Sequence, residues 1–202
     1  MKNYICINEQ KIGLDESQVD KLRAALKVDS VLLGTVAVAE TVKIGEQEMV
    51  VLEQLNGATV LICKELYGEN MEFGSSNNYE DSYVDCACET FADQLGQVIG
   101  EDNIIRHTVD LTSDDGLKDY GIVERRASLL TTEQYRKYVQ TLDKHKLDAY
   151  WWLATPYSTP SHDHSSWVKC VSPSGSIIND GCLIGGGVRP FCILKSNIFV
   201  SK

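Results

Sequence analysis

The sequence predicts an α+β domain with an antiparallel sheet and two main helices. Three observations predict it: strand-like segments come first, two helix-like segments follow in the middle, and further strand-like segments close the chain. Because strands and helices are grouped rather than alternating, the pattern favours an antiparallel sheet over a parallel one. The 202 residues, 43% of them hydrophobic, suffice for one ordinary domain with its own core and a small appendage.

Residues 1–30 are predicted to form that appendage, an N-terminal arm of strand, turn and helix. Asp15 and Gln18 have the spacing of a capping box at the start of the helix. The apolar residues that follow at helical spacing are Val19, Leu22 and Leu26. A stripe this narrow cannot support an independent domain. We therefore expect the arm to lie on the main body or to join copies of the chain into a homo-oligomer.

Residues 31–202 are predicted to form the main domain, which begins with strands. Residues 31–38 are rich in β-branched and apolar side chains and predict a strand. Two further strand-like runs, 49–52 and 59–63, flank the dipeptide Asn56-Gly57. Asn-Gly between apolar runs is the strongest short signal of a β-hairpin.

Two helices are predicted in the middle of this domain. The first follows Ser82, and the second follows Thr131, where Gln134 completes a capping box. Residues 110–121 lie between them as an acidic loop with two glycines. After Tyr150 the chain returns to strands and turns as far as its last residues.

The closing strands carry a resemblance to a known family. Trp151 to Pro156 has the sequence WWLATP, a valine-containing strand precedes Ser174-Gly175, and Gly187 to Pro190 has the sequence GVRP. These segments resemble a domain family of gut Gram-positive bacteria and their phages, whose usual signature is WWLRSP followed by GVRPAL. The resemblance covers most of residues 31–202. The resemblance implies no particular activity. At positions 154 and 155 this sequence has alanine and threonine, where the family usually has arginine and serine.

The same segments resemble the C-type-lectin fold of formylglycine-generating enzymes and of diversified phage ligand-binding proteins. The resemblance implies a C-type-lectin-like domain over residues 31–202. A tryptophan-rich strand and a closing glycine-x-arginine strand would frame a face built from loops. Residues 157–187 would supply that face and would engage a protein or glycan. The resemblance also implies a phage or prophage origin.

The candidate ligand-binding residues lie in this stretch because it is rich in turns and in aromatic and small polar side chains. Rigid aromatics surrounded by small polar groups are typical of adaptable binding loops, although simple loop composition accounts for the pattern about as well. The candidate residues are Tyr157, Ser158, His162, Asp163, His164, Trp167, Asn179 and Asp180. Three others are predicted to be structural: Trp151, Trp152 and Arg189. We expect the adjacent tryptophans to face opposite sides of a strand, and Arg189 to bridge loop carbonyls or a carboxylate.

No catalytic set, metal site or cofactor site is predicted. His162 and His164 could share one side of a strand and hold a metal, but no third ligand is recognisable nearby, which favours an exposed polar turn. The four histidines accompany no serine elbow or cysteine motif, and Gly185-Gly186-Gly187 lacks the features of a phosphate loop. The seven cysteines are odd in number and irregularly spaced, which is typical of reduced, buried thiols in a cytoplasmic protein.

Charge is unevenly distributed along the chain. Residues 40–124 hold nineteen acidic and four basic residues, whereas 125–202 hold five acidic and ten basic ones. This asymmetry predicts an acidic surface. The surface is either simply exposed to solvent or binds to a basic site on a partner. The net charge of −10 argues against nucleic-acid binding, and no apolar run is long enough to span a membrane.

Two functions follow as hypotheses. The first is a non-catalytic binding protein of phage or prophage origin, cytoplasmic in the producing cell or associated with the virion, that binds through residues 157–187. The alternative is an intracellular phage inhibitor of a host defence nuclease that acts through the acidic region 40–124.

Overall fold

The computed structural model describes residues 3–7, 10–26 and 30–202. The N-terminal arm consists of the antiparallel hairpin β1 (Asn3–Ile7) and β2 (Gln10–Leu14), followed by α1 (Glu16–Leu26). The predicted capping box is confirmed, because Gln18 N–H donates to Asp15 Oδ1 (2.8 Å) and Asp15 N–H donates to Gln18 Oε1 (3.0 Å). Of the predicted apolar stripe, Leu22 is exposed, and the side chain of Leu26 lies outside the described residues.

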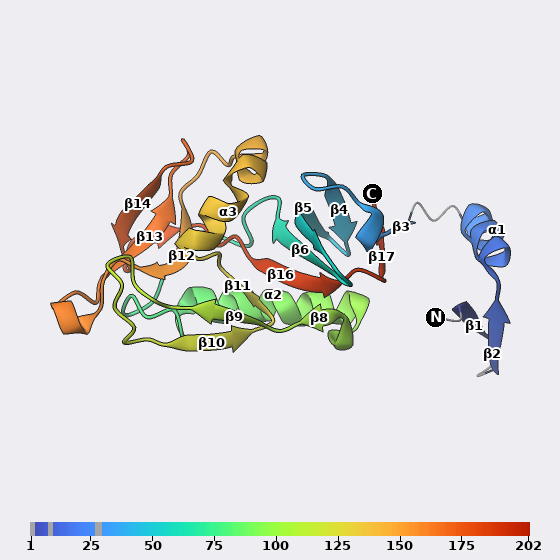
Figure 1. Cartoon of the computed structure of the whole chain (residues 1–202), viewed down its shortest axis with the longest axis horizontal. Coiled ribbons are helices and arrows are strands. Elements are labelled where there is room, and N and C mark those ends of the chain that lie inside the picture. The colour runs from blue at the N-terminus through green and yellow to red at the C-terminus, as the bar shows by residue number, and fades with distance from the viewer. Residues whose placement is uncertain (1–2, 8–9, 27–29) are drawn as a thin grey trace.

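The predicted α+β architecture is confirmed for the main body, whose described strands pair antiparallel in one large and several small sheets (Figure 1). The large sheet has the order β11-β16-β6-β5-β4-β17-β3, with β8 also paired to β16. Its strands are β3 (Ser30–Leu32), β4 (Thr41–Ile44), β5 (Gln47–Leu55), β6 (Ala58–Cys63), β8 (Ile104–Ile105), β11 (Ala127–Ser128), β16 (Phe191–Lys195) and β17 (Phe199–Ser201). The last strand pairs with the first, so the ends of the body lie together in the sheet.

The predicted hairpin at Asn56-Gly57 is confirmed. It joins β5 to β6, and Gly57 has a φ of 81°, which glycine adopts without a steric penalty. The predicted strand over 31–38 is wrong beyond Leu32, because a 3-10 turn (Leu33–Thr35) follows. The side-chain amide of Gln54 donates to the carbonyls of Leu33 (3.0 Å) and Val36 (2.8 Å), and so stabilises a bend in place of a strand ladder.

Two helices lie on opposite faces of the large sheet, as Figure 1 shows. α2 (Tyr83–Ile99) begins at Ser82 and buries Phe91 and Leu95 against one face. α3 (Thr132–Leu142) buries Tyr135 and Leu142 against the other. Both predicted starts are confirmed, and at α3 the full capping box of Thr131 and Gln134 is present.

A three-stranded sheet, β12 (Trp151–Pro156), β13 (Trp167–Val171) and β14 (Ile177–Gly181), lies beside the large one. Its two faces enter two different hydrophobic clusters, because successive side chains of a strand point to opposite sides. Two small two-stranded sheets complete the body: β9 (His107–Asp110) with β10 (Ile122–Arg125), and β7 (Met71–Glu72) with β15 (Gly185–Gly186). The loop between β9 and β10 reaches the end of the three-stranded sheet, where Asp114 N–H donates to the Pro156 carbonyl (2.9 Å).

Candidate ligand-binding face

Two loops that are distant in sequence are bonded together at the end of the three-stranded sheet. Asp115, from the β9–β10 loop, accepts hydrogen bonds from Ser158 Oγ (2.6 Å) and from His162 Nδ1 (3.0 Å). Asp119 accepts from Thr159 Oγ1 (2.7 Å) and from Ser161 N–H (3.2 Å). The candidate loop after β12 is therefore anchored by two carboxylates that sequence analysis assigned only to an acidic loop.

The Asp115 carboxylate is stabilised in its charged form. Hydrogen bonds from Ser113, then from Ser158 and His162, hold its pKa well below its ordinary value of 3.8. A carboxyl whose pKa is lowered by folding adds stability above that ordinary value and loses it as the pH falls through the folded value. The anchor is thus complete at neutral pH and weakens only in strong acid.

Replacing Asp115 with asparagine is expected to loosen this loop while leaving the fold intact. Exchange of the His162 and His164 amides, which bond to Thr159 O, should become faster by hydrogen-exchange mass spectrometry. The free energy of unfolding should fall by less than about 1 kcal/mol because Asp115 is exposed. Asp163→Asn is the matched control, since Asp163 is an exposed carboxylate of the same loop, and asparagine tolerates its φ of 58°. Equal exchange in the two variants would contradict the anchoring role.

Exposed aromatic rings stand beside the anchored loop. Tyr157 is 39% exposed and Trp167 is 48% exposed. The Tyr157 ring lies edge-on to His164 (6.0 Å between centroids) and 5.8 Å from Lys169 Nζ. Lys169 is itself buried and forms an ion pair with Asp114 (2.8 Å). These contacts limit the freedom of Tyr157 while leaving part of its ring open to solvent.

Asn77 joins the two segments that carry the exposed rings. Its amide donates to the carbonyls of Ser158 (2.8 Å) and Trp167 (3.0 Å), and its own oxygen accepts from Tyr120 OH (2.7 Å). It is fully buried. No sequence signal marked it, because its partners lie more than forty residues away along the chain.

Several predicted site residues do not lie in loops or do not face solvent. Ser158 is 1% exposed, because its hydroxyl group is used to bond Asp115, so it supports the face rather than lining it. Trp167, Asn179 and Asp180 belong to strands β13 and β14, where cross-strand pairing overrides their turn-like composition. His162 ends a short 3-10 turn and Asp163 follows it, so His162 and His164 do not alternate as in a strand.

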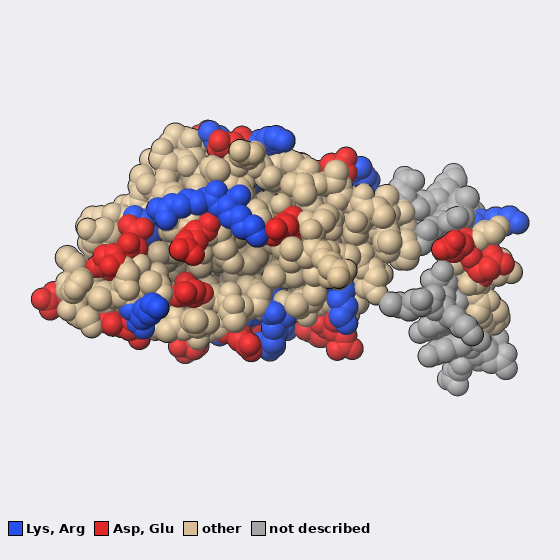
Figure 2. Space-filling model, viewed as in Figure 1, with Lys and Arg blue, Asp and Glu red and all other residues tan. Residues whose placement is uncertain are grey.

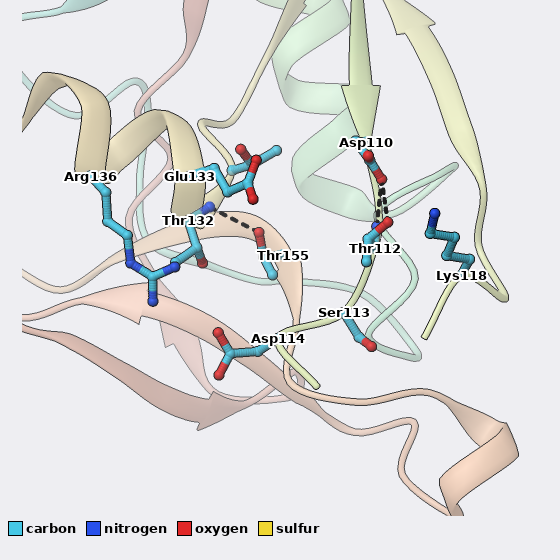
Figure 3. Close-up of a pocket in the computed structure, with 10 residues that line it drawn as sticks. Asp110, Thr112, Ser113, Asp114, Lys118, Thr132, Glu133, Arg136 and Thr155 are labelled. Carbon is cyan, nitrogen blue, oxygen red and sulfur yellow. Dashed lines mark hydrogen bonds between the residues drawn. The ribbon is translucent and has the colours of Figure 1, made fainter. Parts of the chain in front are cut away.

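A polar pocket opens beside this face, between the β9–β10 loop, the start of α3 and β12 (Figure 3). It has a volume of about 290 Å³. Its lining residues are Asp110, Thr112, Ser113, Asp114, Lys118, Thr131, Thr132, Glu133, Arg136 and Thr155. Asp114 connects pocket and face, because it lines the pocket and pairs with Lys169, which lies beneath Tyr157. No pattern in the sequence predicts this pocket.

The three residues predicted to be structural are all buried. Trp151 and Trp152 enter different hydrophobic clusters, which confirms that they face opposite sides of β12. Arg189 donates to the carbonyls of Cys63 (2.9 Å), Lys64 (3.1 Å) and His145 (3.1 Å). Of the two predicted alternatives, it therefore bridges carbonyls and not a carboxylate. Burial lowers the pKa of this guanidinium to about 10.

The thiols and histidines of the described residues form no evident metal centre. Within those residues no three His, Cys, Asp or Glu side chains are grouped so that they could hold a metal ion. Six cysteines there are free, and all but Cys86 are buried. Burial raises the pKa of Cys170 to about 12, so this thiol is not activated as a nucleophile.

Eight of the nineteen acidic residues of the region 40–124 form ion pairs with bases from the rest of the body. Arg125 bonds to Asp85 (2.8 Å), and Arg126 bonds to Glu89 (2.8 Å) and also pairs with Asp93 and Glu101. Further pairs of this kind are Glu53 with Lys137, Asp114 with Lys169, and Glu40 with Lys202. In the view of Figure 2, acidic and basic side chains are intermixed over the body. These tertiary contacts offset part of the charge asymmetry of the sequence.

Comparison with known proteins returns no match to a family model, to a curated protein or to a solved structure. Among the described helices, none combines the length and the apolar character that a membrane crossing requires.

Proposed function

We propose that this chain is a non-catalytic binding protein whose main domain has a C-type-lectin-like arrangement and engages a protein or glycan ligand. The observation that carries the proposal is the anchored loop, which holds Tyr157, His164 and Trp167 on one face. The carboxylates of Asp115 and Asp119 and the buried amide of Asn77 order this face before any ligand arrives. Pre-ordering matters because immobilising a side chain on binding costs about 0.5–1.5 kcal/mol.

The resemblance to phage and prophage sequences supports a host-cell surface as the source of the ligand. A cytoplasmic or virion-associated location, and oligomer formation through the N-terminal arm, belong to the same proposal. The nuclease-inhibitor alternative is less well supported, because a nucleic-acid mimic needs unpaired carboxylates in a continuous area. Arg125, Arg126, Lys137 and Lys169 neutralise many of those in the 40–124 region.

The proposal is tested by replacing Tyr157 and Trp167 together with alanine. Labelled protein should bind intact Gram-positive host cells, and the double variant should lose this binding while keeping a thermal melt near that of the parent. Leu55→Ala with Val98→Ala is the matched control, since both residues are exposed and apolar and belong to β5 and α2. If the double variant melts normally and still binds cells, the face proposed here is not the binding face. Protease treatment of the cells separates a protein ligand from a glycan.

A further inference from the structure

The pocket at the start of α3 has walls made entirely of polar residues. Its ten lining residues comprise five hydroxyl side chains, three carboxylates and two cations. Ligand pockets are usually lined mostly by apolar and aromatic side chains. A pocket lined by polar residues alone favours a small ligand that carries hydrogen-bonding groups on several sides.

One buried wall residue has a hydroxyl group without a partner. Thr132 is 2% exposed, and its Oγ1 makes no hydrogen bond within the part of the chain that the structure describes. Figure 3 shows its side chain directed from the first turn of α3 into the space near Thr155 and Arg136. Leaving such a group unpaired is costly, so its position indicates a ligand group that completes the bond.

The backbone at the start of α3 offers a further donor. Thr132 N–H donates to Thr155 Oγ1 (2.9 Å), and Gln134 N–H donates to Thr131 Oγ1 (3.2 Å). The Glu133 N–H lies between them in the first turn of the helix, where backbone N–H groups have no intrahelical acceptor. The wall thus offers an amide donor and a hydroxyl group at neighbouring positions.

The charges of the pocket do not favour an ionic ligand. An anion would meet the carboxylates of Asp110, Asp114 and Glu133, which outnumber Lys118 and Arg136. Asp110 is bonded by Thr112 (2.6 Å) and Asp114 by Lys169, and among the described residues no three His, Cys, Asp or Glu side chains are grouped as a metal site requires. A neutral ligand with many hydroxyl groups fits this mixture of donors and acceptors best.

We propose that this pocket holds one sugar residue of the ligand, with Thr132, Arg136 and Glu133 hydrogen-bonding its hydroxyl groups. The inference rests on the proposed binding function and names the ligand class as a glycan. The pocket volume of about 290 Å³ suits a single sugar ring rather than an oligosaccharide. The next residue of the glycan would reach Tyr157 and Trp167 by way of the Asp114–Lys169 pair.

The test measures binding of free glucose, galactose, N-acetylglucosamine and N-acetylgalactosamine by saturation-transfer-difference NMR. Inorganic phosphate and glutamate serve as ionic comparators. Thr132→Val keeps the side-chain shape and should weaken sugar binding about two- to tenfold, while the protein melts at or above the parent temperature. Arg136→Ala should weaken it about tenfold. Lys144→Ala, an exposed cation of the turn after α3, should bind like the parent.

The outcomes separate this inference from the function on which it rests. Binding of a sugar that both pocket variants weaken and Lys144→Ala does not weaken supports the pocket. Binding of phosphate or glutamate alone, or sugar binding that the pocket variants leave unchanged, overturns it. If no sugar binds but the Tyr157 and Trp167 double variant loses cell binding, the proposed binding function is supported and the sugar pocket is contradicted. If Thr132→Val does not fold, sugar binding by Arg136→Ala still tests the pocket, because Arg136 is exposed.

Discussion

Replacing Trp152 with alanine is expected to lower the free energy of unfolding by about 3–5 kcal/mol, which is the usual effect of truncating a buried tryptophan. Trp152 is 1% exposed. Its ring packs edge-on against Phe73 (5.7 Å between centroids), and its indole N–H donates to the Met71 carbonyl (3.1 Å). Gly186 lies so close that a Cβ there would come within 2.6 Å of the ring. The truncation therefore opens a cavity and leaves a carbonyl without its donor.

Chemical denaturation of the parent and the variant measures this loss. Because a domain of this size is stable by about 5–15 kcal/mol, the variant could be partly unfolded at 37 °C. Tyr150→Ala is the control, since Tyr150 is exposed just before the same strand, and its stability change should lie within about ±0.5 kcal/mol. Trp152→Phe should recover part of the loss, because it restores aromatic packing without the N–H. A loss below about 1 kcal/mol in Trp152→Ala would show that the site collapses without a cavity.

Replacing Arg189 with alanine is expected to cost less, about 2–3 kcal/mol, because two effects oppose each other. The change leaves the carbonyls of Cys63, Lys64 and His145 without their donor. It also removes the contact of the guanidinium with the Trp151 ring (5.2 Å to its centroid). Relief of the buried charge offsets part of this cost, since burial already lowers the pKa of Arg189 to about 10.

Thermal and chemical unfolding of Arg189→Ala and Arg189→Lys test this account. Lysine keeps a charge but cannot donate from a planar fork to three carbonyls, so Arg189→Lys should recover only part of the loss. Full recovery by lysine would mean that the charge matters rather than the geometry of the donors. Binding by the folded fraction of either variant should remain near the parent level, because Arg189 is buried and does not line the pocket.

Local sequence alone was sufficient for the elements whose stabilising contacts lie within a few residues. The capping boxes at Asp15 and Thr131 and the hairpin turn at Asn56-Gly57 formed where predicted, because each depends on side chains three residues apart or on a single φ angle. The opposite facing of Trp151 and Trp152 followed from the alternation of a strand in the same way.

Only the tertiary structure decided the features that depend on distant partners. The segment after Leu32 turns because Gln54, from a different strand, bonds its carbonyls. Asn179 and Asp180 are in a strand because β13 pairs with them, although their composition favours a turn. Part of the acidic surface is neutralised because bases from the second half of the chain pair with it.

The candidate pocket likewise depends partly on local sequence and partly on tertiary structure. Its walls come from residues 110–118, from the start of α3 and from Thr155, and no sequence pattern links these segments. The sequence by itself determined the helix start that supplies one wall and the strand that supplies another. Only the folded chain brought them together with the acidic loop, because Asp115 and Asp119 of that loop bond to Ser158 and Thr159, about forty residues further along the chain.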